Sequence, residues 1–567
     1  MPSPSDKGIP RCLLCSMHCP VGARLDALGH VSTVYPADLG LDQGACVRAL
    51  TAARLVDAPE RILNARKADE PATVDVVIRD IVASSGRDTS QAAVIVDLNR
   101  PLEGVLALAA LCREGGVRFC GYAPLQDMPL VRAGLAACPP FAEIAECDLV
   151  VAVGDPFSSH PAVARPVRDM QFGERGNRLV CVDVAWGRTC AAANEALLVE
   201  PTKLAGFVAA LAVACGAQAV GDALGGKSAE EICSTLNLPA DKVAALASGL
   251  KGAKAAGILL SHSLGRYAHG AAVAAAVKEM AGALGARAWP LLVSTNSGVV
   301  PRLKKTFGAV ELGELIRDAE AGRIKALYVF GVDLGVALPQ KLWMQLRDKC
   351  ELITWAGSLA GAFAQQADYV LPLALPWEEE GTVLDAGGRP AEFVPPLAKP
   401  ATVLSLNQLA GRLADAAGAG PTPAPAVGEL LSAGAEEAAL DELVGPDILA
   451  AEEPGSGQAV VVGAPEPHGY AGGMTLAYSS WQQRIAAEEA ASLSPDLAAE
   501  LDLPESGAVE LHNGAEVAVA CKTARDGTGK VVALPSHTAS LRDLLQWQGT
   551  DGIIQPVPAV VNIRKCE

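Results

Sequence analysis

Short apolar runs rich in β-branched residues alternate with helix-like stretches through the middle of the chain. Runs that are apolar at every position are typical of parallel strands covered by helices on both faces. The expected strands are Ala93–Val96, Leu149–Val153, Leu179–Val184, Gly257–Leu260, Pro290–Val293, Ala326–Phe330, Glu351–Thr354 and Tyr369–Pro372. We therefore predict an α/β protein with two doubly wound parallel domains, and the order of the runs leaves open whether one of them is discontinuous.

The last hundred residues follow a different pattern, in which apolar and polar positions alternate. Two such runs within Gly507–Ala520 flank Asn513-Gly514, a strong hairpin signal, and Lys530–Pro535 supplies another strand. This pattern predicts a β-barrel-like domain at the C-terminus. The expected divisions are 1–65, 66–147 with 322–412, 148–321, an Ala-, Pro- and Glu-rich linker at 413–458, and the barrel at 459–567.

Composition and charge exclude several classes of partner. The chain has 567 residues, of which 50% are hydrophobic, and a net charge of −18. An acidic chain argues against nucleic-acid binding, which needs a basic face. The first residues lack the apolar segment of a secretory signal, and Leu204–Val220, the longest apolar stretch, is built mostly of small residues. We expect that stretch to be a buried helix, and the protein to be cytoplasmic with no direct membrane insertion.

Four of the fifteen cysteines are spaced as metal ligands. Cys12, Cys15 and Cys19 share one short loop, and Cys46 follows after 26 intervening residues. Four such thiolates suit a [4Fe–4S] cluster, so residues 1–65 are the expected cluster domain. Zinc is the alternative, although structural zinc sites usually pair two close cysteines with a second close pair. Arg48 would stabilise an anionic cluster or relay electrons, or it is a surface arginine.

Polar residues follow several of the predicted strands. Loops at the carboxyl ends of parallel strands form the ligand crevice of doubly wound folds. We therefore expect an elongated nucleotide-like ligand, although each residue alone is also an ordinary turn or helix-cap residue. Neither G-x-G-x-x-G nor a Walker A motif is present, which disfavours a simple dehydrogenase or NTPase. The candidate binding residues are Gly154, Asp155, Ser158, His160, Asp183, Ser261, His262, Asn296, Gly331 and Asp333.

Three segments together resemble the molybdopterin oxidoreductase superfamily. Cys12–Leu50 is similar to its N-terminal cluster motif, with Arg48 where many members have lysine, and Cys147–Arg168 is similar to the segment that runs from a strand through G-x-N-P. Ala367–Phe393 resembles the ADVVLP…E…GT…N…GR motif, in which Glu378, Gly381, Thr382 and Arg389 match. Ser494–Pro535 resembles the C-terminal dinucleotide-binding barrel of the superfamily.

The resemblance implies a cluster domain, two α/β domains that hold a molybdenum or tungsten centre on molybdopterin guanine dinucleotide, and a capping barrel. It also implies that electrons pass between the metal, the pterin and the cluster, with Glu378 and Thr382 at the cofactor. Cys120 lies near the distance at which active members place a metal ligand, but Val117–Cys120 reads as a strand, so a core cysteine is the alternative.

Two departures from the family pattern argue against a bound pterin. Pro201-Thr202-Lys203-Leu204 replaces P-G-T-D, and Asp155 replaces the G-x-N-P asparagine. Our leading hypothesis is an iron–sulfur electron-transfer subunit of a multi-subunit redox complex, with partner subunits that carry iron–sulfur clusters or a flavin. The alternatives are an active molybdenum or tungsten enzyme of the formate or formylmethanofuran dehydrogenase type, and a structural scaffold subunit without redox function.

Overall fold

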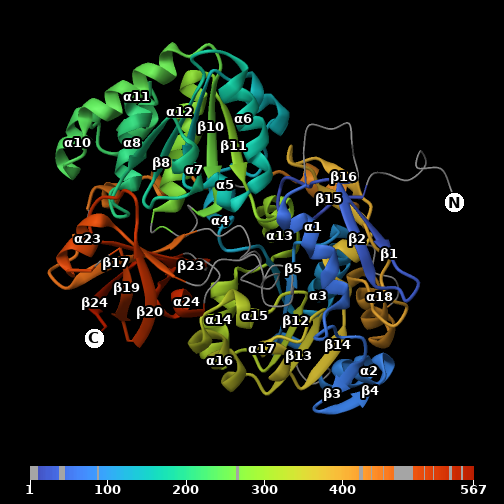
Figure 1. Cartoon of the computed structure of the whole chain (residues 1–567). Coiled ribbons are helices and arrows are strands. Elements are labelled where there is room, and N and C mark those ends of the chain that lie inside the picture. The colour runs from blue at the N-terminus through green and yellow to red at the C-terminus, as the bar shows by residue number, and fades with distance from the viewer. Residues whose placement is uncertain are drawn as a thin grey trace.

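Two parallel sheets with their helices and a β-barrel form the three large bodies of the molecule (Figure 1). The structure is a computed structural model. It describes residues 10–36, 45–85, 89–263, 267, 269–419, 425–435, 437–450, 453–464, 490–503, 505–514, 516–535, 539–550 and 553–566.

The first sheet has five parallel strands in the order β11-β10-β7-β8-β9. The chain adds β8 and β9 on one side of β7 and then returns to add β10 and β11 on the other side. The topological switch point, where doubly wound folds bind ligands, therefore lies between β7 and β10. The bounds are β7 Leu149–Val153, β8 Arg178–Asp183, β9 Glu195–Leu198, β10 Ala256–Ser261 and β11 Arg287–Leu291.

The longest apolar stretch is a buried helix of this unit, but it is shorter than we predicted. Helix α8 covers Leu204–Cys215 and packs against α12, Gly270–Leu284. It ends at Gly216, whose φ of +101° stops the helix before α9, Gln218–Ala223. Within the described residues, no helix is both long and apolar enough to span a membrane. Further helices of the unit are α5 Pro156–Ser159, α6 Ala164–Gly173, α7 Arg188–Ala192, α10 Ala229–Leu236 and α11 Ala240–Gly252.

The second sheet has seven strands in the order β4-β3-β14-β13-β12-β5-β6. The five strands from β14 to β6 are parallel, whereas β3 runs antiparallel to β14 and extends the edge, an addition the sequence did not predict. The bounds are β3 Ala65–Lys67, β4 Glu70–Ala72, β5 Ala92–Asp97, β6 Arg118–Tyr122, β12 Ala326–Phe330, β13 Leu352–Gly357 and β14 Tyr369–Pro372.

Helices cover both faces of the second sheet. One face packs against α2 Val74–Ser85, α3 Leu102–Gly115, α13 Val300–Phe307 and α18 Leu406–Ala416. The other face packs against α14 Leu312–Glu320, α15 Leu334–Ala337, α16 Gln340–Lys349 and α17 Ala362–Gln365. The described fold class is thus the predicted one, with two doubly wound units, the second built from two separate stretches of the chain.

The N-terminal segment packs against the first sheet. It contains a hairpin of β1 (Val21–Leu25) and β2 (Val31–Pro36), followed by α1 (Val47–Ala52). Its buried cysteines share one core cluster with Val150, Ala152 and Leu259 of the sheet. A second hairpin, β15 (Gly381–Leu384) with β16 (Pro390–Phe393), lies beside it (Figure 1), and Leu13 packs on this hairpin.

The C-terminal strands close into a six-stranded barrel in the order β17-β21-β18-β20-β19-β24. β19 and β20 pair as the hairpin that Asn513-Gly514 predicts. A short hairpin of β22 (Gln546–Thr550) and β23 (Ile553–Val557) lies outside the barrel. The remaining bounds are β17 Gln458–Ala464, β18 Ala491–Leu493, β19 Ser506–His512, β20 Glu516–Thr523, β21 Val531–Pro535, β24 Ala559–Lys565, α23 Pro495–Glu500 and α24 Ala539–Leu544.

The Ala-, Pro- and Glu-rich stretch contributes buried side chains to both α/β cores. Its described part contains α19 Val427–Ser432, α20 Leu440–Leu443 and a short 3₁₀ turn at Pro446–Leu449. Val427 and Leu430, three residues apart on one face of α19, pack with α3, and Ile448 packs into the core of the first sheet. The division of the whole chain into domains stays a prediction.

Candidate functional site

Cys12, Cys15 and Cys19 lie on one irregular loop that backbone hydrogen bonds hold closed. The Cys12 amide donates to the Cys19 carbonyl over 2.9 Å, and the His18 amide donates to the Cys15 carbonyl over 3.2 Å. These three cysteines are buried, and Cys46, directly before α1, is partly buried. The loop and the first turn of α1 thus bring all four thiols into one core cluster.

The four thiols influence one another electrostatically, which indicates that their sulfur atoms are neighbours. Burial, then the charge of Cys46, raises the pKa of Cys15 to about 12. A hydrogen bond from the Cys19 thiol lowers the pKa of Cys46 to about 6 and raises that of Cys19. Burial, followed by the Cys15 and Cys46 charges, raises the pKa of Cys12. A cation or a positively charged cluster core would relieve this repulsion.

Arg48 connects the thiol loop to the carboxyl end of β7. Its guanidinium is buried and donates to the carbonyls of Ser158, over 2.7 Å, and Ser159, over 2.6 Å. Its charge also lowers the pKa of Cys46, after the larger effects of Cys19, burial and the Ala49 amide. Arg48 is therefore buried between two elements that the sequence singled out separately, so the surface-arginine alternative is wrong.

A directed chain of hydroxyl groups crosses the switch point of the first sheet. Ser263 donates to Ser261 over 3.0 Å, and Ser261 donates to Ser159 over 3.0 Å. His160 donates from Nε2 to the Leu292 carbonyl over 2.8 Å, so Nδ1 is an acceptor for the Ser159 hydroxyl at 3.2 Å, a shorter distance than the 3.4 Å from that hydroxyl to the Pro156 carbonyl. Burial lowers the pKa of His160 to about 3, which keeps the ring neutral.

Two further candidates complete this crevice. Gly154, with φ of +84°, lies so close to Ser263 that a Cβ would stand 2.6 Å from its Oγ, so the side chain of Ser263 fills the space beside the glycine. The ring of His262 meets that of His160 edge to face, with centroids 5.5 Å apart. The structure thus brings together the predicted residues that follow β7 and those that follow β10, and their side chains pack on one another.

Asp155 and Asp183 have different surroundings, although both end strands. The carboxylate of Asp155 accepts hydrogen bonds from the amides of Ser158, Arg188 and Thr189 and from the Thr189 hydroxyl, over 2.6 to 3.2 Å. Asp155 is therefore saturated and fixes the turns around it. Asp183 accepts from the Val184 amide over 2.8 Å and lies within 4.8 Å of two cysteine sulfur atoms.

Asn296 joins the two sheets. Its Nδ2 donates to the carbonyls of Leu98 and Arg100, over 2.9 and 2.7 Å, and its Oδ1 accepts from the Leu384 amide over 2.8 Å. All three bonds reach residues of the second α/β unit, whereas Asn296 follows β11 of the first. Since its amide is fully used, Asn296 acts as a clamp between the units.

The remaining predicted residues lie at the carboxyl edge of the second sheet. Asp333 caps α15 by accepting from the Gly335 amide over 2.8 Å, and Gly331 has a φ of +87° beside Arg100. Glu378 accepts from the guanidinium of Arg61, and the Thr382 amide donates to a carboxylate of α3. None of the hydrogen bonds described for these residues reaches the first-sheet group.

Cys120 lies within β6, as its strand pattern predicts. Its parallel partner is Ile95 of β5, and its side chain belongs to the apolar core under α14. Burial raises its pKa. A cavity of about 20 Å³, room for about one water molecule, is lined by Cys120 with Tyr122 and Glu311 among others. The role of Cys120 stays a prediction.

The sequence reasoning missed Asp127, which follows β6 and begins α4, Met128–Arg132. Its buried carboxylate accepts from the amides of Val293 and Ser294, over 2.8 and 2.9 Å, and from the Ser297 hydroxyl over 2.7 Å. Burial raises the pKa of Asp127 to about 7, and the negative charge of Asp127 contributes to raising the pKa of Cys15. An Asp directly before Met-Pro is a common helix-start signal, which could have marked it.

Two buried ion pairs were also missed. Arg61 binds Glu378, and Arg100 binds both Glu379 and the Ala374 carbonyl, the latter over 2.8 Å. Consecutive glutamates therefore anchor two different segments of the chain. Charge alone gave no signal for these pairs, because the partners stand far apart in the sequence.

The comparisons with known proteins agree on one fold. Residues 86–402, more than half of the chain, match the family model described as molybdopterin oxidoreductase. No curated protein sequence matches significantly. Among solved structures, acetylene hydratase from Pelobacter acetylenicus is similar with a TM-score of 0.76 and 12% identity, covering 99% of this chain and 100% of that chain. At that identity the structural likeness concerns the fold alone.

Proposed function

Since this chain belongs to the molybdopterin oxidoreductase family, we propose that it holds a [4Fe–4S] cluster on Cys12, Cys15, Cys19 and Cys46 and transfers electrons within a larger redox complex. The observation that carries the proposal is the gathering of these four thiols, largely buried, around one loop and one helix start. A bound cluster would supply one-electron transfer at this place. Its redox partners are subunits that carry further clusters or a flavin.

The spread of the sulfur atoms favours a cluster over zinc. Four sulfur ligands about 2.3 Å from one tetrahedral zinc ion stand about 3.8 Å apart. Among the described residues, the one group of three or more potential ligands that lie within 4.8 Å of one another is in β8 and α7, so the N-terminal sulfur atoms are spread more widely. The buried Ser16 hydroxyl in the same loop lacks a described partner, and a cluster sulfide would accept its hydrogen bond.

Arg48 has a defined task in this proposal. Its positive charge offsets the negative charge that four thiolates bring into the core. Its two bonds to the carbonyls of Ser158 and Ser159 fix the thiol loop against the switch point of the first sheet. Arg48 is therefore a positioning residue that joins the electron-transfer site to the crevice.

The family implies a molybdopterin with its metal, but the described crevice residues fit this cofactor poorly. Asp155 is saturated by its four donors, and Ser263 fills the space beside Gly154. Leu204 stands in the place of the acidic residue of P-G-T-D and is buried, and the neighbouring Lys203 binds Glu200 and Glu453, each over 2.9 Å. The proposed function therefore does not depend on a pterin, and electron transfer is the first of the two candidate functions.

A second candidate is an active molybdenum or tungsten enzyme of the family. The observation in its favour is Asp127, a buried carboxylate beside Cys15 whose pKa burial raises to about 7. Groups with a pKa near neutrality are suited to proton transfer. The saturation of Asp127 by three hydrogen-bond donors places this candidate second.

We further propose a reducing, cytoplasmic location. No disulfide joins any two of the described cysteines, including Cys181 and Cys190, whose sulfur atoms are 3.3 Å apart. Such a pair would be oxidised readily in a disulfide-forming compartment.

Metal analysis of anaerobically purified protein tests the proposed function. We expect about four iron atoms per chain and neither molybdenum nor tungsten. Cys15→Ala should lose the iron and the visible absorption, whereas Cys112→Ala, which removes a buried single thiol in α3, should keep both. Stoichiometric molybdenum or tungsten would establish the second candidate instead, and protein without iron would leave a structural scaffold.

A further inference from the structure

A second group of potential metal ligands lies at the carboxyl end of β8. Cys181 and Asp183 are two residues apart on this strand, so their side chains point to the same face. Helix α7 begins after Gly187 and brings Cys190 over the same point. All three side chains are buried, with exposures of 0%, 5% and 3%. The spacing C-x-D-x₆-C thus becomes one compact group.

The geometry of this group is that of a small coordination sphere. One sulfur atom of each cysteine and one oxygen atom of Asp183 all lie within 4.8 Å of one another. The two sulfur atoms are 3.3 Å apart, and the Cys181 thiol also donates to the Gly154 carbonyl over 3.6 Å. Two thiolates about 2.3 Å from a tetrahedral zinc ion stand about 3.8 Å apart. The two sulfur atoms would therefore have to move apart by about 0.5 Å to bind the metal.

The group also lacks a cation among the described residues, and burial, followed by the charges of Cys190 and Asp155, raises the pKa of Asp183 well above its usual range. The Asp183 carboxylate accepts hydrogen bonds from the backbone amides of Val184 and Ala185, and no lysine or arginine is among the described groups that shift its pKa. Neighbouring Asp155 adds a second buried carboxylate, and its four donors are amides and a hydroxyl, not cations. Buried carboxylates without a cation are costly, and a divalent metal would remove this cost.

We propose that Cys181, Asp183 and Cys190 bind one zinc ion, with a water molecule or another exogenous group as the fourth ligand. Zinc is the biological divalent metal best suited to two thiolates and one carboxylate in a tetrahedral site. Binding replaces the two thiol protons, which are released to solvent, with one Zn²⁺. The ion would pin α7 to the end of β8, next to the crevice loop that holds Ser158 and Ser159.

The proposal stands independently of the iron–sulfur cluster, because none of its three ligands comes from the N-terminal loop. Cobalt is the probe of choice, since Co²⁺ occupies zinc sites and absorbs visibly when thiolates bind it. The full chain is used with Cys12, Cys15, Cys19 and Cys46 all replaced by Ser in the background, so that the N-terminal loop offers no thiol to cobalt. The test adds Co²⁺ to this protein after chelation, under reducing conditions without oxygen.

We expect one cobalt ion per chain with thiolate charge-transfer absorption. Cys190→Ser and Cys181→Ser should each weaken binding at least tenfold, and Asp183→Asn should weaken it while the sulfur absorption remains. Cys215→Ser, which alters a buried thiol of α8 in the same α/β unit, should bind as the parent does. Zn²⁺ should raise the melting temperature of the parent and of Cys215→Ser only.

Two results would overturn the proposal. One is cobalt binding that is absent, or unchanged in the double variant Cys181→Ser/Cys190→Ser, in protein whose circular dichroism matches that of the parent. The other is a Cys181–Cys190 disulfide found by mass spectrometry in protein isolated under reducing conditions. The iron content of the unsubstituted chain is read separately, so failure here leaves the proposed electron-transfer function untouched.

Discussion

At the scale of single residues, His160 shows how the crevice fixes a protonation state. Nε2 donates to a carbonyl, so Nδ1 must accept from Ser159, and that requirement sets the direction of the hydroxyl chain through Ser261 and Ser263. A protonated ring would turn Nδ1 into a donor facing a hydroxyl that is already oriented toward it. Burial and hydrogen bonding thus act together to keep His160 neutral.

This neutrality predicts a pH dependence of stability. Burial lowers the pKa of His160 to about 3 in the folded chain, whereas an unfolded histidine titrates near about 6.5. Between these values the unfolded state binds more protons, so the stabilisation is present above about pH 6.5 and is lost as the pH falls toward 3. Relative to His160→Asn, the wild-type free energy of unfolding should fall by up to about 1.4 kcal/mol per pH unit over this window.

Urea denaturation of both proteins between pH 7 and the lowest pH at which they remain folded measures this slope. His269→Asn, at a partly exposed position that begins α12, controls for the loss of a histidine elsewhere in the same unit. Equal slopes for wild type and His160→Asn would show that the buried ring does not titrate as described.

At the scale of elements, the strands were largely predictable and the contacts between elements were not. Leu149–Val153 and Ala326–Phe330 match β7 and β12 because strands buried on both faces must be apolar at every position. The strand predicted at Pro290–Val293 exists, but its bounds were placed too far along the chain, since β11 is Arg287–Leu291. Pro290 lies inside β11 because that strand is at the edge of the sheet, where a missing amide costs little.

The residues of the candidate site differ in the same way, because local patterns were predictable and contacts between distant elements were not. The spacing of the N-terminal cysteines is local, so the sequence could predict that they gather in one place, whereas Asp127 and the Arg100–Glu379 pair depend on how distant elements meet. Arg100 and Glu379 are 279 residues apart, and nothing in either neighbourhood indicates the other. The Cys181–Cys190 group was missed for a related reason, because its spacing matches no common ligand motif and only the return of α7 over β8 assembles it.

The Arg100–Glu379 pair leads to a prediction at this scale. Glu379 also accepts from the Leu406 amide over 3.1 Å, so it holds α18 as well as the loop that contains Arg100. Glu379→Gln removes the negative charge and leaves the buried guanidinium with two described carboxylate neighbours, Asp97 at 3.8 Å and Glu378, which is itself paired with Arg61. Breaking one partner of such a pair should cost about 3–5 kcal/mol of unfolding free energy.

Thermal or urea denaturation checks the size of this loss. Glu380→Gln is the matched control, since Glu380 is the next residue and is exposed; its substitution should change stability by no more than about 0.5 kcal/mol. A Glu379→Gln variant as stable as Glu380→Gln would mean that the buried pair is not a structural anchor.

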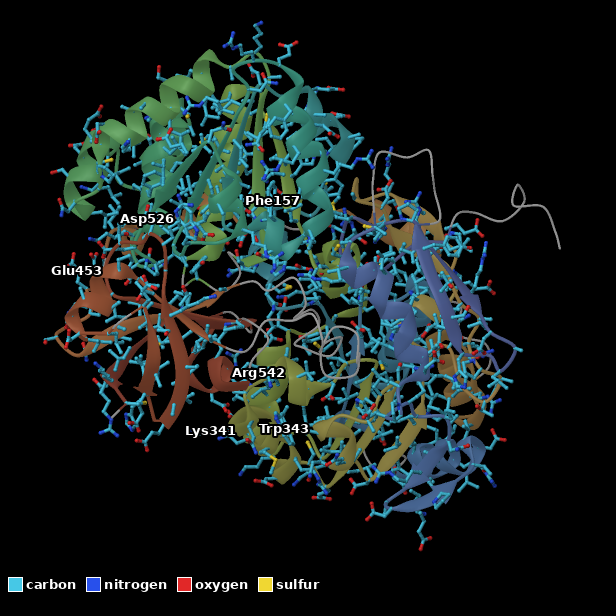
Figure 2. All side chains as sticks on the ribbon, in the orientation of Figure 1. Phe157, Lys341, Trp343, Glu453, Asp526 and Arg542 are labelled. Carbon is cyan, nitrogen blue, oxygen red and sulfur yellow. The ribbon has the colours of Figure 1, made fainter. Side chains whose placement is uncertain are left out.

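At the scale of the whole molecule, the barrel and the segment that leads into it contact the α/β units through polar side chains as well as through apolar ones, such as Val460 and Val462 in the core of the first unit. Figure 2 shows Glu453 and Arg542 at two separate junctions of the barrel with its neighbours. Lys203 binds Glu453 over 2.9 Å at the first unit, and Arg525 lies over the ring of Trp186, 5.4 Å from its centroid. The family match and the barrel agree with the resemblance that the sequence motifs indicated. The barrel therefore spans the two units that flank the crevice.

Arg542 is the described polar contact of α24 with the second unit, and it carries the last prediction. It donates to the Val336 carbonyl at α15 over 3.0 Å, near the buried Asp333, and burial lowers its pKa. A short helix of four residues has little stability of its own, so α15 depends on such contacts. Arg542→Ala should therefore increase amide hydrogen exchange in Leu334–Ala337 about tenfold, equivalent to about 1.4 kcal/mol of local opening free energy.

Arg564→Ala removes an arginine whose ion partners, Glu510 and Glu516, lie within the barrel, and it should leave α15 unchanged. If both variants exchange alike at α15, the barrel is held to the second unit by other contacts, and Arg542 contributes nothing to closing the crevice between the two sheets.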